Sequence, residues 1–104
     1  MNEICAVETD TFLKELVDLA VRRLQPRRVI LFGSRARGDH DRRSDYDVAI
    51  EAPAVSEAEW TRFVLDIQDN LDTLHGIDIV RLETVNPALQ RRIEREGKVL
   101  WNGR

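Results

Sequence analysis

Two aspartates separated by one residue, Asp45 and Asp47, open an apolar segment that we predict to be a strand. Residues two apart on a strand point to the same face, so the two carboxylates project together with their Cα atoms about 6.6 Å apart. Such carboxylates repel each other unless cations lie between them, and Mg²⁺ prefers one or two carboxylates together with substrate phosphates. The pair therefore predicts metal binding, and the alternative is two acids that face solvent where a strand begins.

A third aspartate, Asp78, lies inside the otherwise apolar run Ile77–Val80, where an uncompensated buried charge would be costly. If its strand neighbours that of the other two acids, all three meet on one face. They would then form a two-metal site, in which one ion lowers the pKa of an attacking hydroxyl and the other holds a triphosphate. The alternative is an exposed residue on an edge strand, with Arg81 as a simple ion-pair partner.

A glycine and a serine, Gly33 and Ser34, follow the apolar run 28–32, and ten residues separate Ser34 from Asp45. Glycine after a buried strand lets a phosphate approach the backbone closely. A serine that opens a helical turn offers its hydroxyl and N–H groups at the positive end of a helix dipole. A tight turn with a capping serine explains a Gly-Ser pair alone equally well, but the aspartates downstream favour a phosphate site.

Charged residues of both signs crowd the segment between Ser34 and Tyr46. They are Arg35, Arg37, Asp39, Asp41, Arg42, Arg43 and Asp45. The mixture suits a site that holds phosphates and divalent metals together, and the alternative is a solvated loop that neutralises itself. The net charge of −3 gives no global field for attracting a polyanion, so we expect no direct nucleic-acid binding.

The flanking sequence predicts the elements that must position these residues. Helices are predicted over 10–24, 56–71 and 86–97, and strands over 28–32, 46–50, 77–82 and 98–101. Ser56 with Glu59 is typical of a capping box, Asn86 before Pro87 is typical of a helix start, and Gly97 of a helix end. We therefore expect a single α/β or α+β domain over 1–104, with helices packed against a small sheet.

At these residues the sequence resembles the minimal nucleotidyltransferases of the DNA polymerase β superfamily. Their hallmark is Gly-Ser, ten residues, Asp-x-Asp and another Asp on a later strand, and the resemblance extends from about Val29 to Trp101. Tyr46 stands where members commonly carry an aliphatic residue. The resemblance implies a nucleotidyltransferase fold with a small mixed sheet and a core over about 28–101.

The resemblance also implies the roles of individual residues. Gly33 and Ser34 would bind the triphosphate of ATP, and Arg35 and Arg37 would lie beside its phosphates. The catalytic and metal-binding residues, for two Mg²⁺ ions, would be Asp45, Asp47 and Asp78.

Stand-alone members of this kind are antitoxins of HEPN-type RNase toxins. The resemblance implies transfer of AMP from ATP to a tyrosine of such a toxin, within a hetero-oligomer. We expect no separate domain for binding the acceptor, so the partner protein would present it. The alternatives are an antitoxin that binds nucleotide and inhibits by contact alone, and a transferase acting on a small molecule such as an aminoglycoside.

The remaining features indicate no other activity. No run approaches the roughly 20 apolar residues of a transmembrane helix, and the first residues lack the order of a signal peptide, so we expect a cytoplasmic protein without membrane contact. The single cysteine, Cys5, has no partner for an internal disulfide. Arg91, Arg92 and Arg95 suit the negative end of a helix dipole, which we favour over a partner-binding patch.

Overall fold

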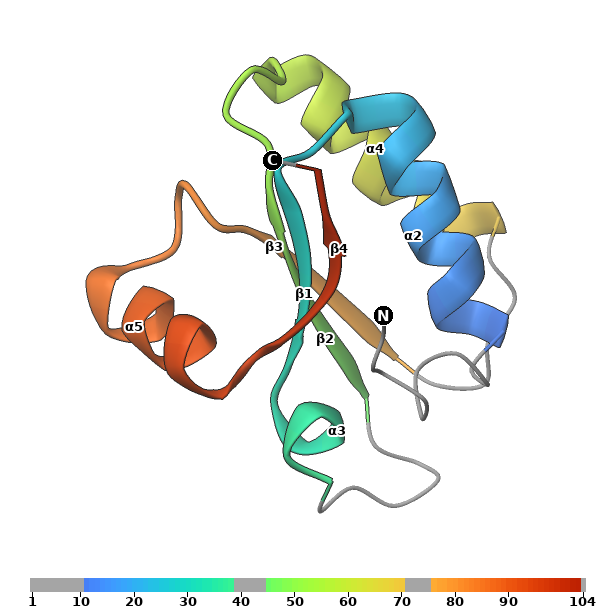
Figure 1. Ribbon diagram of the computed structural model, residues 1–104. Helices are drawn as coiled ribbons and strands as arrows, with labels where there is room; N and C mark the ends of the chain where they lie inside the picture. Colours follow the sequence, from blue (N-terminus) through green and yellow to red (C-terminus); the bar gives the residue numbers. More distant parts are fainter. Residues whose placement is uncertain (1–10, 39–44, 71–75, 104) are drawn as a thin grey trace.

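A four-stranded mixed sheet forms the centre of the protein in a computed structural model that describes residues 11–38, 45–70 and 76–103 (Figure 1). The strands are β1 (Arg28–Phe32), β2 (Tyr46–Glu51), β3 (Ile77–Arg81) and β4 (Lys98–Asn102). They lie in the order β3-β2-β1-β4, so β3 and β4 are the edges. Strand β1 runs antiparallel to β2 and β4, whereas β2 and β3 are parallel.

Helices cover both faces of this sheet, as Figure 1 shows. Helices α2 (Thr11–Leu24) and α4 (Glu57–Asn70) pack on one face, and α5 (Pro87–Glu96) packs on the other. A single turn, α3 (Ser34–Arg37), follows β1 directly. The predicted elements are confirmed, and each bound differs from its prediction by at most one residue.

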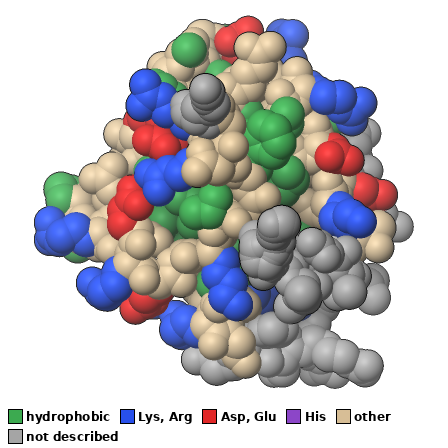
Figure 2. All heavy atoms as spheres, viewed as in Figure 1, with side chains coloured by type: hydrophobic (Ala, Val, Ile, Leu, Met, Phe, Trp, Pro, Cys, Tyr) green, Lys and Arg blue, Asp and Glu red, His purple; other side chains and the backbone are tan. Residues whose placement is uncertain are grey.

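The surface seen from the same side carries basic and acidic side chains interspersed around exposed hydrophobic ones (Figure 2). No large field of one sign covers this face, in keeping with the mixed composition of the chain. No helix in the ranges that the structure describes is both long enough and apolar enough to cross a lipid bilayer.

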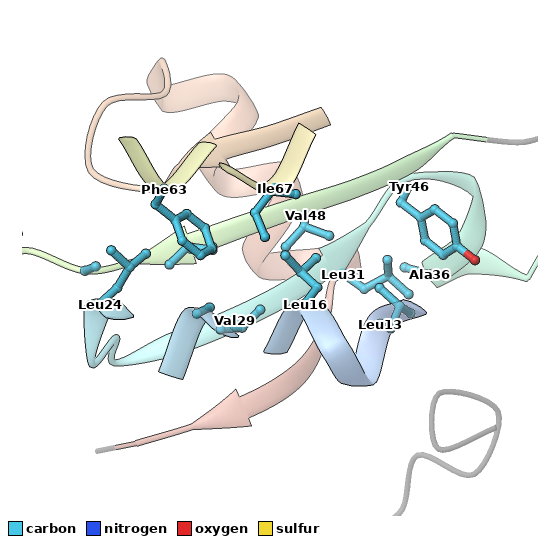
Figure 3. Packing of buried hydrophobic residues seen from close by; sticks show 13 residues of the cluster. Leu13, Leu16, Leu24, Val29, Leu31, Ala36, Tyr46, Val48, Phe63 and Ile67 are labelled. Atoms are coloured by element: carbon cyan, nitrogen blue, oxygen red, sulfur yellow. The ribbon is translucent and has the colours of Figure 1, made fainter. Parts of the chain in front are cut away.

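The larger hydrophobic core lies between the sheet and the pair α2 and α4. Figure 3 shows its side chains converging from both helices, from alternate positions of β1 and β2, and from α3. Burial of each valine, leucine, isoleucine or phenylalanine side chain contributes about 1.5–3 kcal/mol to the stability of the fold. The buried members are Leu13, Leu16, Ala20, Leu24, Val29, Leu31, Ala36, Tyr46, Val48, Ile50, Ala52, Phe63 and Ile67.

The opposite face carries a smaller core under α5, made of Ile30, Ala49, Leu82 and Ile93. Gly97 ends α5 with an ordinary extended backbone, so the predicted helix end is confirmed but no left-handed turn is involved. Space is the reason for glycine here. A Cβ would press on the Ile30 side chain and would lie 2.6 Å from the Ile93 carbonyl oxygen.

Ionic contacts and caps hold α5 and α4 in place. Arg28 donates one hydrogen bond to Glu51 and two to the carboxylate of Glu94, which ties α5 to the sheet. The Asn86 side chain accepts the Leu89 N–H at 2.8 Å, as predicted for the start of α5. The predicted capping box of α4 is also confirmed, because the N–H of the N3 glutamate donates to the Ser56 hydroxyl at 3.1 Å.

Candidate active site

The strand register brings the predicted acids together on the face covered by α5. Asp47 is the partner of Asp78 in the parallel pair β2–β3, and of Phe32 in the antiparallel pair β1–β2. Its neighbours Tyr46 and Val48 point into the core on the other face, so Asp47 points toward the α5 side. The prediction that β3 neighbours β2 is therefore confirmed, and it brings Asp47 and Asp78 together; Asp45 lies just before β2 and is not part of this register.

Two glycines leave room for the carboxylates. Gly33 has φ +77°, a conformation that favours glycine, and a Cβ there would overlap the Asp47 Oδ2 atom. A Cβ at Gly76 would lie 2.7 Å from Asp45 Oδ1. The Asp47 carboxylate thus lies against the backbone at the end of β1, and the Asp45 carboxylate lies against the backbone before β3.

The electrostatic environment of Asp47 raises its pKa above the ordinary value. Burial has the largest effect because it disfavours the charged form, and the negative charges of Asp78 and Asp45 act in the same direction. The positive charges of Arg92 and Arg37 oppose this rise. A bound cation would offset both the burial of the Asp47 carboxylate and its repulsion by the neighbouring negative charges.

The expectation that Asp78 is a buried charge is wrong. This residue is exposed, because β3 is an edge strand and one side of it is open to solvent. Arg81, the ion-pair partner considered for Asp78 in the alternative, makes its contacts with other groups. The Arg81 guanidinium donates to the Ala52 carbonyl at 2.8 Å and packs over the ring of Trp60, on the α4 side of the sheet.

The acidic cluster fits a divalent metal that is completed by substrate. Within the described ranges, no three acidic or histidine side chains close around a single point as a preformed cage would. Mg²⁺ usually takes one or two carboxylates and fills its remaining positions with water and phosphate oxygens, so it needs no such cage. Paired carboxylates, the glycine at the end of β1 and the raised pKa of Asp47 all suit this donor set.

The Gly-Ser motif lies at the turn from β1 into α3. Gly33 caps α3 and its carbonyl accepts the N–H groups of Ala36 and Arg37, both at 3.1 Å. The helix that Ser34 opens has only four residues, so its dipole contributes less than the sequence argument assumed. The Asp47 carboxylate takes the space that glycine leaves at position 33, so what remains for a phosphate is the hydroxyl of Ser34.

The two arginines of the motif point to different places. The Arg35 guanidinium lies 4.0 Å from the centre of the Tyr46 ring, which packs in turn against Phe12 on the α2 side. Arg37 instead lies near the acids and 3.7 Å from Glu96. Arg37 is therefore the better placed of the two for phosphate. The tyrosine between the acids does not intrude on them, since its side chain points to the opposite face.

The sequence led us to assign Arg92 to the negative end of a helix dipole, and it gave no role to Glu96. In the structure the charge of Arg92 acts on Asp47, and Glu96 lies 3.5 Å from Arg92 and 3.7 Å from Arg37. The predicted loop charges Asp39, Asp41, Arg42 and Arg43 lie outside the described residues.

Chains of solved toxin–antitoxin complexes share the fold of this protein. A chain of a toxin–antitoxin complex with AMP-PNP is 24% identical, with a TM-score of 0.69, over 86% of this chain and 72% of that one. A chain of a complex between a tri-AMPylated Shewanella oneidensis HEPN toxin and an MNT antitoxin is 21% identical, with a TM-score of 0.63, over 86% and 68%. At these identities the similarity shows a shared fold.

A third structure, provisionally described as a minimal nucleotidyltransferase, is 27% identical, with a TM-score of 0.63, over 82% of this chain and 85% of that one. No curated protein sequence matches significantly. The family model described as "Polymerase beta, Nucleotidyltransferase" matches residues 14–103, which include every strand and all three acids. The chain belongs to the Polymerase beta nucleotidyltransferase family.

Proposed function

We propose that this protein transfers AMP from ATP to a hydroxyl group of a HEPN-type partner protein and thereby acts as its antitoxin. The observation that carries the proposal is that Asp47 is paired in register with Asp78, while the Asp47 carboxylate lies directly beside Gly33. Chains of the same fold occur in complexes with a HEPN toxin and with AMP-PNP, which supports the choice of partner and donor.

The acids would hold Mg²⁺ in this reaction, with Asp45 and Asp47 as the first ligands and Asp78 completing the set. When bound, the metal lowers the pKa of the acceptor hydroxyl and neutralises triphosphate charge. Gly33 makes room for the Asp47 carboxylate, and Ser34 would offer its hydroxyl to the phosphates.

The transfer replaces one bond to phosphorus with another. The acceptor oxygen forms a bond to the α-phosphorus, and the bond from that phosphorus to the bridging oxygen breaks. Pyrophosphate leaves with the electron pair, and the hydroxyl proton passes to solvent water. We propose tyrosine as the acceptor residue.

The test is intact-mass spectrometry of the HEPN-type partner after incubation with this protein, ATP and Mg²⁺. The partner should gain one or more AMP units with wild type and none with Asp45→Ala/Asp47→Ala. A matched control is Asp18→Ala/Asp69→Ala, which removes two exposed acids from α2 and α4 and should transfer normally.

If wild-type protein protects cells from the partner but leaves the partner unmodified in this assay, the proposed AMP transfer is ruled out. If the Asp45/Asp47 variant still protected cells from the partner as well as wild type, inhibition by contact would replace catalysis as the account.

A further inference from the structure

The side chain of Tyr46 contacts two helices on the face of the sheet opposite to that of Asp47. The residue is 5% exposed, and its ring packs against the Phe12 ring of α2 with 4.7 Å between the ring centres. The Arg35 guanidinium of α3 lies 4.0 Å from the centre of the same ring. Tyr46 and Ala36, the buried residue of α3, lie at the same end of the larger core (Figure 3). Tyr46 therefore connects α2, β2 and α3.

The backbone of Tyr46 is fixed to the neighbouring strand. Its N–H donates a hydrogen bond to the Gly76 carbonyl at 3.0 Å, and it is paired with Ile77 in the parallel register of β2 and β3. The residues directly before and after it are Asp45 and Asp47. A residue that is held by both its ring and its backbone thus separates two of the proposed metal ligands.

The Arg35 side chain comes from the turn that carries the other half of the proposed site. Arg35 follows Ser34 directly, and α3 has only four residues. Isolated helices shorter than about 12–15 residues are marginal in water, so contacts with the rest of the fold must hold this turn. The contact between Arg35 and the Tyr46 ring is one of them, and a guanidinium over an aromatic face has a preferred geometry. This contact helps to set the position of Ser34.

We propose that Tyr46 and Arg35 are positioning residues, which fix the turn of Ser34 relative to the two acids that flank Tyr46. The inference rests on the proposed function for its ligand, Mg²⁺ with ATP. Metal and phosphates are joined in that ligand, so the turn and the acids bind it together only when their separation is right. Arg35 then acts through the ring, in place of the phosphate contact that the sequence suggested.

Two titrations without the partner protein test this proposal. Mg²⁺ with ATP, followed by calorimetry, engages the turn and the acids, whereas Mn²⁺ alone, followed by electron paramagnetic resonance, engages only the acids. Tyr46→Leu should weaken binding of Mg²⁺ with ATP about fivefold, the equivalent of about 1 kcal/mol, which is typical of a partly buried cation–π contact. It should leave Mn²⁺ binding within about twofold of wild type. Tyr46→Phe keeps the ring and should bind both ligands as wild type does.

A double-mutant cycle tests whether the two residues act as a pair. Arg35→Leu should weaken binding of Mg²⁺ with ATP by the same factor as Tyr46→Leu. The double variant should lose no more than either single variant, because both substitutions remove the same contact. A direct contact between Arg35 and phosphate would instead make the two losses multiply.

Phe63 offers a matched control in the same core. It is a fully buried ring on α4, and the Arg23 guanidinium lies 5.8 Å from its centre. Phe63→Leu should lower the urea midpoint and still bind Mg²⁺ with ATP normally while it is folded. A loss of binding in Tyr46→Leu is therefore not the general result of replacing a core ring.

Four results would overturn the proposal. Tyr46→Leu could bind Mg²⁺ with ATP as tightly as wild type, or could weaken Mn²⁺ equally, which would locate the damage in the acids. Tyr46→Phe could behave like Tyr46→Leu, which would assign the effect to the hydroxyl. The losses of Arg35→Leu and Tyr46→Leu could multiply. Failure of the proposed function is a separate outcome, in which wild type binds Mg²⁺ with ATP but leaves the partner unmodified while the titrations still decide the role of Tyr46.

Discussion

At the scale of single residues, Asp47 is the site residue that interacts with the largest number of neighbouring elements. It is paired in register with Asp78, it occupies the space that a side chain at Gly33 would need, and its charge interacts with Arg92 from another layer. A carboxylate with so many fixed neighbours can move little. Its position is therefore set by β1 and β3 as much as by its own strand.

We expect Gly33→Ala to impair both folding and transfer. The substitution would place a side chain at φ +77° and ψ −158°, which costs about 1–3 kcal/mol, and would force the Asp47 carboxylate aside, which adds about 1–3 kcal/mol. Urea denaturation should show the combined loss. Mass spectrometry of the partner should show transfer reduced at least about tenfold.

Gly38→Ala shows the cost of a left-handed residue without a steric contact. Gly38 has φ +85° and ψ 6°, whereas Gly33 has ψ −158°, in a region that essentially only glycine adopts, so the backbone cost is the smaller one at Gly38. A Cβ at Gly38 would meet no atom within 4 Å, so this variant should lose about 1 kcal/mol of stability and retain transfer. Loss of transfer in Gly38→Ala would mean that the contact with Asp47 is not what impairs Gly33→Ala.

At the scale of elements, the ion pair between Arg28 and Glu94 fixes α5 on the sheet. Its two parallel hydrogen bonds lower the pKa of Glu94, and burial opposes this only in part. We expect Glu94→Gln to lower the free energy of unfolding at pH 7 by about 1 kcal/mol or less, since the pair is partly exposed.

The pH dependence of the stability lost in Glu94→Gln follows from the direction in which the pKa of Glu94 is shifted. A carboxylate whose pKa is lower in the folded state stabilises the fold above its unfolded value, here 4.5, and ceases to do so as the pH falls through the folded value. Wild type and Glu94→Gln should thus differ at pH 7 and converge in acid. Glu15→Gln, which alters an exposed glutamate of α2, should match wild type throughout, and a difference that persisted in acid would argue against the ion pair.

The elements themselves were predictable because local signals agreed. Apolar spacing, the caps at Ser56 and Asn86 and the Gly-Ser turn all depend on neighbours within a few residues. The sequence could not decide between a buried Asp78 and the exposed edge-strand residue of the alternative, because the place of β3 at the edge is a property of the whole sheet. Arg92 was assigned to the helix dipole alone for a similar reason: its charge reaches Asp47 only because α5 folds back over the sheet.

At the scale of the whole molecule, the two faces of the sheet are unequal. Among the described residues, the core under α2 and α4 contains thirteen buried side chains, whereas the core under α5 contains four. Asp47 and Asp78 lie on the face with the smaller core, and the effect of Arg92 on Asp47 depends on α5 keeping its position there. Cooperative units with few buried contacts open at lower free energy than the central core does.

We therefore expect α5 to open separately from the rest of the domain. In hydrogen exchange followed by mass spectrometry, the amides of α5 should exchange at least about tenfold faster than those of α2. Glu94→Gln should speed exchange in α5 further and leave α2 unchanged, because the lost ion pair connects only α5 to the sheet. Equal protection of the two helices, or equal acceleration of both by Glu94→Gln, would show that the two layers unfold as one unit.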